Sequence, residues 1–142
     1  MAVLYFDASA FVKLVVREDG TEEAAALWDS ADVVASSRLA YAEVCAAIAA
    51  ADRDHRLSPR AARQATTEWA DAWGDVRAVE LTEGVAREAG ALAARHALRG
   101  ADAVHLASAL AIGADTAILA AWDRQLHRAA AAAGFRVAPS SL

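Results

Sequence analysis

The sequence is poor in cysteine, proline and lysine: it has one cysteine, two prolines and one lysine among 142 residues. The single cysteine, Cys45, excludes a disulfide framework within the chain and any zinc site built from several cysteines. The four histidines are scattered and form no metal-ligand motif. With few prolines and 23% charged residues, the composition is also unlike that of a disordered chain.

No long hydrophobic run is present either. The longest segment without Asp, Glu, Lys or Arg, Ala103–Ala114, covers 12 residues, whereas a membrane-spanning helix needs about 20. The first residues have no basic region and reach Asp7 too early for a signal peptide. We therefore expect a cytoplasmic protein that makes no contact with a membrane.

Alanine dominates what is present, with 42 of the 142 residues. The hydrophobic content of 57% therefore reflects helix-forming alanine more than large core side chains. The net charge of −5 argues against a general nucleic-acid coat, because phosphate binding relies on Lys and Arg. It leaves open a nuclease that holds cations at an acidic centre. The length is that of one domain, so we expect residues 1–142 to form a single domain.

Short apolar or β-branched runs alternate with longer helical patterns along the chain. The expected strands are Val3–Phe6, Asp32–Ser36, Arg77–Leu81, Thr116–Ala120 and Phe135–Ala138. The expected helices are Ser9–Arg17, Thr21–Ser30, Ser37–Asp54, Ser58–Trp73, Thr82–Ala97, Ala101–Ile112 and Asp123–Ala133. This alternation predicts βαβ units and a parallel sheet covered on both faces. An all-α bundle is the alternative, because the strands are short and rich in alanine.

Two aspartates lie just beyond the carboxyl ends of expected strands. Asp7 follows Val3–Phe6 directly, and Asp123 comes shortly after Thr116–Ala120. Ligands of open α/β sheets bind outside the carboxyl ends of the strands. Asp115 precedes its strand, at the opposite edge, and is excluded. Either aspartate alone is also consistent with a helix cap, but two at one edge favour a site.

Two further acids lie within expected helices. Glu43 has mostly apolar neighbours and no Lys or Arg three or four residues away. A buried charge without a partner is costly unless a cation neutralises it; the alternative is a glutamate at a helix edge facing water. Asp102 lies in the first turn of its helix, where the dipole alone would favour an anion. His105 is expected to be a core or edge histidine with its hydrogen bonds satisfied.

The four carboxylates come from separate segments and would repel one another at one pocket unless cations were present. Oxygen ligands without a cysteine or a histidine pair select hard ions such as Mg²⁺ or Mn²⁺. Such ions activate water and stabilise a leaving oxygen on a phosphate. The constellation therefore favours metal-assisted hydrolysis of a phosphodiester, with water as the nucleophile.

Other phosphate-handling families fit the residues less well. A haloacid-dehalogenase-like phosphatase needs a second Asp two residues after the first, where this chain has Ser9. A receiver domain needs a lysine on a late strand, but the only lysine is Lys13, in the first expected helix. No glycine-rich run precedes a lysine, so a P-loop is absent.

Four segments resemble the PIN-domain ribonucleases, and most of all the VapC toxins of toxin–antitoxin modules. They are Tyr5–Ser9, Ala42–Val44, Asp102–Ala109 and Asp123–Leu126. The resemblance runs through nearly the whole chain, and its third segment is the most specific. It implies a three-layer α/β/α fold with a central parallel sheet of about five strands. It also implies a Mg²⁺ or Mn²⁺ centre formed by four acids with support from Ser9. These acids are Asp7, Glu43, Asp102 and Asp123.

The same resemblance implies a function. The chain would be the toxin of a toxin–antitoxin module, an endoribonuclease that hydrolyses RNA and so inhibits translation or growth. Its partners would be RNA, a cognate VapB-like antitoxin and a second copy of the chain, within a toxin–antitoxin hetero-oligomer. The antitoxin would place an arginine among the four acids. Two alternatives are a catalytically weak PIN-domain protein that acts through a partner, and a metal-dependent DNA nuclease.

One departure from the family pattern concerns the last aspartate. The family often has Thr or Ser two residues before it, where this chain has Ala121. Arginines near the acid-bearing segments are candidates for phosphate contacts or are ordinary surface charges. They are Arg38, Arg99, Arg124 and Arg128. Of the tryptophans, Trp122 is the candidate for a contact near the site, whereas the spacing of Trp69 and Trp73 favours packing.

Overall fold

The computed structural model describes residues 1–142. Its strands are β1 (Val3–Phe6), β2 (Val33–Ser37), β3 (Val76–Val79), β4 (Ala117–Ala120) and β5 (Arg136–Ala138). Its helices are α1 (Ala8–Val15), α2 (Thr21–Ser30), α3 (Leu39–Arg53), α4 (Pro59–Trp73), α5 (Glu83–His96), α6 (Gly100–Ile112) and α7 (Arg124–Ala132). No helix is both long enough and apolar enough to cross a membrane.

All five strands belong to one parallel sheet in the order β3-β2-β1-β4-β5. Strand β1 is central and pairs with β2 on one side, in the register Val3 to Val33. On its other side it pairs with β4, in the register Phe6 to Ala120. The predicted parallel sheet of about five strands is confirmed, and the all-α alternative is wrong.

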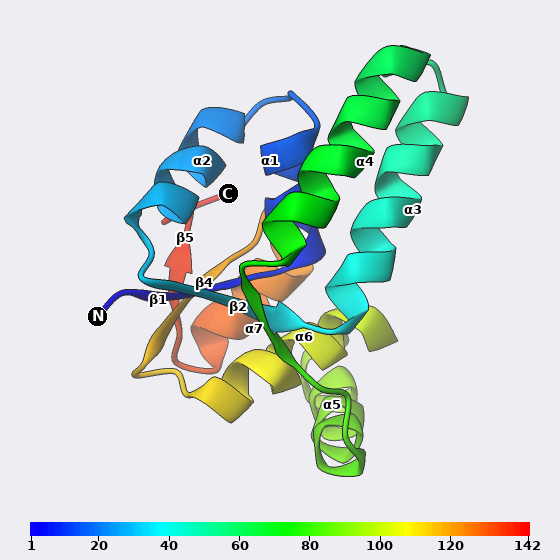
Figure 1. Cartoon of the computed structure of the whole chain (residues 1–142). Coiled ribbons are helices and arrows are strands. Elements are labelled where there is room, and N and C mark those ends of the chain that lie inside the picture. Colours follow the sequence, from blue (N-terminus) through cyan, green and yellow to red (C-terminus); the bar gives the residue numbers. More distant parts are fainter.

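The residues of β1 alternate between two hydrophobic cores. Val3 and Tyr5 pack in a core formed mainly with α5, α6 and α7. Leu4 and Phe6 pack on the opposite face, in a core formed with α1, α3 and α4. This alternation follows from the period of two in a strand, and the buried sheet explains why all four residues are apolar. Figure 1 shows α1 to α4 on one side of the sheet and α5 to α7 on the other, which confirms the three-layer arrangement.

The element bounds differ from the sequence-based expectation by at most two residues, for example at the end of β3. The sequence predicts that this strand continues to Leu81, but it ends at Val79. The next residue, Glu80, accepts hydrogen bonds from the Arg38 guanidinium, and the Arg38 N–H donates to the Val79 carbonyl at 3.0 Å. This exposed pair takes the chain out of the sheet two residues earlier than the hydrophobic pattern predicts.

Candidate functional site

Asp7 begins α1 immediately after the central strand. Its Oδ1 accepts hydrogen bonds from the Ser9 Oγ at 2.6 Å and from the Ala10 N–H at 3.0 Å. The residue is 3% exposed. Asp7 is therefore a helix cap, as one of its two interpretations predicted. Both bonds end on the same oxygen, so Oδ2 is left for another ligand.

The electrostatic environment of Asp7 favours a nearby cation. Burial raises the pKa of Asp7 from 3.8 to about 6, and the neighbouring Glu43 acts in the same direction. His105, the Ser9 hydroxyl and the Ala10 N–H lower the pKa in part. At neutral pH the carboxylate is held ionised at a cost in folding free energy that a bound cation would offset.

Glu43 lies on α3 and reaches a histidine on the opposite layer of the fold. Its Oε1 lies 2.5 Å from the His105 Nε2, and 27% of the Glu43 side chain is exposed. On the other side of the ring, Nδ1 lies 2.8 Å from the Tyr5 hydroxyl. Burial opposes the charged form of His105, but the bond to Glu43 and the other nearby carboxylates leave its pKa raised overall. Glu43 therefore does not simply face water, because its carboxylate contacts a buried histidine.

Asp102 and Asp123 are held by one exposed arginine. Arg99 Nε lies 3.3 Å from the Asp102 Oδ2, and Arg99 Nη2 lies 3.4 Å from the Asp123 Oδ2. Burial raises the pKa of Asp102, and the Asp123 carboxylate adds to this effect, while Arg99 opposes it. Arg99 thus already provides positive charge between two of the predicted ligands.

The ends of β1 and β4 are joined by hydrogen bonds that bring Asp7 and Asp123 to the same edge. The Asp7 N–H donates to the Ala120 carbonyl at 3.2 Å. The Ser9 Oγ accepts from the Trp122 N–H at 2.8 Å. Ala121 is fully buried and offers no hydroxyl. Asp123 is supported instead by the Leu126 N–H, which donates to Oδ1 at 2.9 Å.

The contacts of the structure link the acids in part. His105 contacts Glu43, and Arg99 contacts both Asp102 and Asp123. Asp115, by contrast, is exposed at the turn before β4, at the opposite end of the sheet. The sequence pattern correctly separated Asp115 from the group.

The side chains as placed form no ready-made metal cage: no three His, Cys, Asp or Glu residues stand close enough to hold one ion. His105 engages one oxygen of Glu43, and Arg99 engages one oxygen each of Asp102 and Asp123. The donor set nevertheless fits a hard divalent cation, because it is all carboxylate and two of its members are buried. Closing the site around an ion requires the exposed Arg99 side chain to move.

Two contacts in the site were not visible in the sequence. The sequence offers Arg99 as a phosphate contact or a surface charge, but its side chain pairs with Asp102 and Asp123. The spacing of three residues between Arg99 and Asp102 is the one local signal for this pairing. The bond between His105 and Glu43 spans 62 residues and has no local signature. Both ring nitrogens of His105 have hydrogen-bond partners in the core, as expected. One of them, Nε2, contacts Glu43, a predicted metal ligand.

The other candidate side chains lie outside this group. Arg38 pairs with Glu80, and Arg124 and Arg128 are exposed. The Trp122 indole packs against Gly20, where an added Cβ would lie only 2.8 Å from its Nε1. Trp69 is 1% exposed and donates to the Tyr41 carbonyl, so it is a core residue as its spacing predicted.

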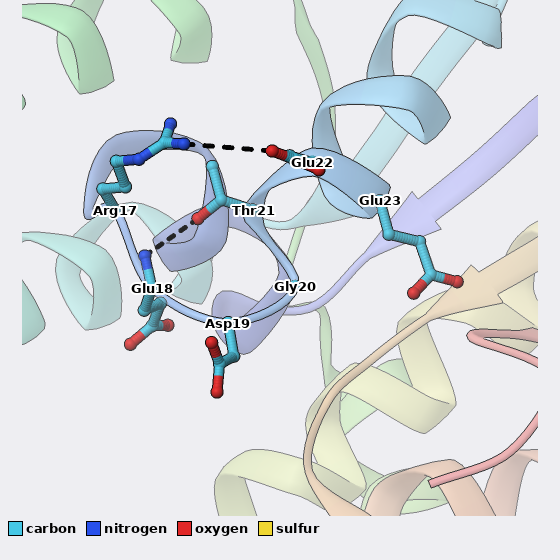
Figure 2. Close-up of a pocket in the computed structure, with 7 residues that line it drawn as sticks. All are labelled: Arg17, Glu18, Asp19, Gly20, Thr21, Glu22 and Glu23. Atoms are coloured by element: carbon cyan, nitrogen blue, oxygen red, sulfur yellow. Dashed lines mark hydrogen bonds and ion pairs between the residues drawn. The ribbon is translucent and has the colours of Figure 1, made fainter.

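A hollow of about 600 Å³ lies at the loop between α1 and α2 and is lined by residues 17–23 (Figure 2). Its charged groups are partly paired within the loop: Arg17 lies 3.9 Å from Glu22. The Glu18 N–H donates to the Thr21 Oγ1 at 3.0 Å. None of the predicted site residues lines this hollow.

Comparison with known proteins adds evidence that the geometry does not contain. A family model described as the PIN domain matches residues 4–132. The chain is 57% identical over 142 residues to ribonucleases VapC45 and VapC49 of Mycobacterium tuberculosis, covering 100% of this chain and 99% of each relative. It is also 33% identical to ribonuclease VapC46 of the same species, over 99% of this chain and 100% of the relative.

Solved structures share the fold at low sequence identity. A protein from Pyrobaculum aerophilum superposes with a TM-score of 0.64 at 21% identity, over 96% of this chain and 85% of that one. A chain of a toxin–antitoxin complex from Klebsiella pneumoniae superposes with a TM-score of 0.59 at 17% identity, over 84% of this chain and 86% of that one.

Proposed function

The chain belongs to the PIN-domain family, and from this premise we propose that it is a VapC-type toxin, an endoribonuclease that hydrolyses RNA and so inhibits translation or growth. The observation that supports the proposal is the position of Asp7 and Asp123 just beyond the carboxyl ends of β1 and β4, with Arg99 joining Asp123 to Asp102. This acidic edge lies in a chain that is 57% identical, end to end, to two ribonucleases named VapC. We take residues 1–142 as one PIN domain that acts in the cytoplasm.

The four acids are the proposed catalytic and metal-binding residues, with Mg²⁺ or Mn²⁺ as the cofactor. Asp7, Glu43, Asp102 and Asp123 would hold the ion, and Ser9 would support Asp7 and the loop before Asp123. When bound, the ion supplies activation of a water molecule and stabilisation of the leaving 3′-oxygen. Hydrolysis then leaves a 3′-hydroxyl and a 5′-phosphate.

The chain's own residues prepare this site in distinct ways. Ser9 and the Ala10 N–H orient the Asp7 carboxylate and leave Oδ2 open. The Leu126 N–H orients Asp123 by engaging its Oδ1, and Arg99 contacts its Oδ2. Arg99 is exposed and, once released from the two aspartates, lies where it can attract the phosphates of RNA. The burial of Asp7 and Asp102 limits the contact of their carboxylates with bulk water.

The proposed partners are an RNA substrate, a cognate VapB-like antitoxin and a second copy of the chain. The contacts of Arg99 support the expectation that an antitoxin arginine inhibits the site. A guanidinium already bridges two of the four acids within this chain, so a second one can engage the remaining carboxylates by the same charge-assisted pairing.

The test of the proposed activity uses purified protein stripped of metal. We expect no cleavage of RNA in EDTA, recovery on addition of Mn²⁺, and no cleavage of a DNA strand of the same sequence. Full activity of metal-free protein in EDTA would overturn the metal mechanism. Equal cleavage of the DNA and the RNA would favour the alternative of a metal-dependent DNA nuclease. Mn²⁺ binding without cleavage of any RNA would favour the alternative of a catalytically weak protein that acts through a partner.

The inhibitory role of the antitoxin has a separate test. We would co-purify the toxin with an antitoxin that lacks its basic C-terminal residues and measure RNA cleavage by the intact complex. We expect the complex to hold together through apolar contacts and to regain part of the nuclease activity. If the complex instead dissociates and free toxin accounts for all cleavage, insertion of an arginine is not the inhibitory mechanism.

A further inference from the structure

We propose that His105 is a positioning residue for Glu43, and that Tyr5 keeps the proton of His105 on the nitrogen that faces Glu43. The proposal deepens the function above and rests on it only for the role of Glu43 as a metal ligand. The hydrogen-bond chain itself belongs to the protein without metal.

The chain of contacts runs from the sheet to the acid through buried groups. The Ser37 N–H lies 3.0 Å from the Tyr5 hydroxyl oxygen, and that oxygen lies 2.8 Å from the His105 Nδ1. His105 Nε2 then lies 2.5 Å from the Glu43 Oε1. Tyr5 is 0% exposed and His105 is 1% exposed, so water does not replace these partners.

Counting donors and acceptors assigns the proton. A backbone N–H only donates, so the Tyr5 oxygen must accept from Ser37. The Tyr5 O–H can donate to Nδ1 when that nitrogen carries a lone pair, and the contact with Glu43 selects this tautomer, because a carboxylate only accepts. The proton therefore sits on Nε2 and is donated to the Glu43 carboxylate, where a bare nitrogen lone pair would be repelled.

Nε2 also carries a proton when the His105 ring is positively charged. In the charged form Nδ1 also carries a proton and donates it to the Tyr5 oxygen. The Tyr5 O–H would then need another acceptor. Ser108 Oγ, on the same helix as His105, is the one buried side-chain oxygen or nitrogen without a partner and is the candidate acceptor. In both forms the group that Glu43 meets is Nε2–H.

The contact matters because it joins two layers of the fold. Glu43 lies on α3, which packs on the face of the sheet that holds Leu4 and Phe6. His105 lies on α6, on the opposite face. The bond holds the flexible Glu43 side chain by Oε1 and leaves Oε2 for an ion. Partners of this kind commonly change metal affinity by about 10–100-fold.

The first experiment examines the metal-free wild-type protein. Long-range ¹H–¹⁵N NMR spectra of the histidine rings at pH 8 distinguish the two neutral tautomers. We expect the His105 signal to report the Nε2–H form in the wild type and in Glu43→Ala, where the Tyr5 hydroxyl alone remains on Nδ1, and a mixture of both forms when Tyr5→Phe is added to Glu43→Ala. A wild-type ring in the Nδ1–H form would overturn the proposal, and this result does not depend on whether the protein binds metal or cleaves RNA.

The second experiment measures Mn²⁺ affinity by calorimetry on matched variants. In His105→Gln the side-chain amide can reach the position of Nε2, whereas in His105→Asn it cannot. We expect His105→Asn to weaken Mn²⁺ binding by about 10-fold or more, and His105→Gln to recover most of the loss. In a Glu43→Gln background the two variants should bind alike, because the charge that they position is absent.

Equal Mn²⁺ affinity of His105→Asn and the wild type would overturn the proposal, as would failure of His105→Gln to exceed His105→Asn. If His105→Asn does not fold, the comparison of His105→Gln with the wild type and the NMR assignment still decide it. A wild-type protein that binds no Mn²⁺ would contradict the proposed function, and the tautomer would then decide the inference by itself.

Discussion

The two halves of the acidic site are held in opposite ways. Asp7 and Glu43 meet uncharged or buried donors, namely a hydroxyl, a backbone N–H and a histidine that is itself held by Tyr5. Asp102 and Asp123 share one arginine whose side chain is 75% exposed, over distances of 3.3 and 3.4 Å. The first pair is fixed by the core, and the second is balanced by a charge that solvent can reach.

The difference indicates which half changes when a cation arrives. Exposed ion pairs contribute about 0–1 kcal/mol to stability, so releasing Arg99 costs little. The donors around Asp7 are part of the fold and need not move. The half on β1 and α3 is thus preorganised, and the half on α6 and α7 adapts. The following predictions test this contrast, from the largest expected effect to the smallest.

Asp7→Asn removes a charge from the preorganised half and keeps the shape of the side chain. We expect RNA cleavage to fall by more than about 100-fold, beyond the range typical of supporting residues, while the protein stays folded. Activity assays with Mn²⁺ and growth of cells that express the variant measure this. Asp115→Asn is the matched control and should change little; equal losses from the two substitutions would show that the site lies elsewhere.

The same substitution should stabilise the metal-free protein. Because burial raises the pKa of Asp7 to about 6 from 3.8, the folded state binds more protons than the unfolded state between these values, and stability falls as the pH rises through them. Above pH 6 the full cost, roughly 2–3 kcal/mol, is present and is removed in Asp7→Asn. Urea unfolding in EDTA should therefore show a larger advantage of the variant at pH 7.5 than at pH 4.5. An advantage independent of pH would contradict the assigned cause.

Ser9→Ala should give an intermediate effect. The Ser9 hydroxyl donates to Asp7 and accepts from the Trp122 N–H, so its loss affects the ends of both β1 and β4. We expect about 10-fold weaker Mn²⁺ binding and roughly 1 kcal/mol lower stability. Calorimetry and urea unfolding measure the two effects, and Ser9→Thr, which keeps a hydroxyl, serves as the control. Unchanged Mn²⁺ affinity in Ser9→Ala would remove Ser9 from the site.

Arg99→Gln, in the adaptable half, should give the smallest change, and with the opposite sign for metal binding. Without the guanidinium, Asp102 and Asp123 are free to bind a cation, and we expect Mn²⁺ affinity without RNA to rise by about 2–5-fold, in keeping with the strength of exposed ion pairs. RNA binding should weaken and depend less on salt. Arg124→Gln, at the exposed first residue of α7, is the control. Weaker Mn²⁺ binding in Arg99→Gln would show that Arg99 organises the acids instead of competing for them.

The sequence predicts this contrast only in part. The alternation of strands and helices placed Asp7 and Asp123 at one edge, because the carboxyl ends of parallel strands lie together. The lack of a Lys or Arg near Glu43 in the sequence predicted a bound cation or a glutamate facing water, and it did not predict the contact with His105. Such a contact depends on how α3 and α6 pack across the end of the sheet, and no local pattern encodes that arrangement.

Strand ends were harder to predict for the same reason. The alternation of charged and apolar residues over Arg77–Leu81 favours a longer β3, yet the strand ends at Val79, where Arg38 pairs with Glu80. The role of Arg99 was likewise ambiguous in the sequence, since an arginine near an acid is equally consistent with a phosphate contact, a surface charge or an ion pair. Only the position of Asp123 relative to α6 decides among them.

The alternation of side chains along β1 has a consequence for how cells escape a toxic protein of this kind. Val3 and Tyr5 pack in one core, and Leu4 and Phe6 pack in the other. The same strand supplies the Tyr5 hydroxyl and is followed directly by Asp7. Deleting or inserting a single residue before Asp7 would exchange the faces of the strand and remove the carboxylate from its edge in one event. Cells that survive toxin expression should therefore carry small in-frame insertions and deletions in this strand, alongside substitutions of the acids. Insertions and deletions in the loop between α3 and α4, residues 54–58, should leave the protein toxic and should not appear among the survivors.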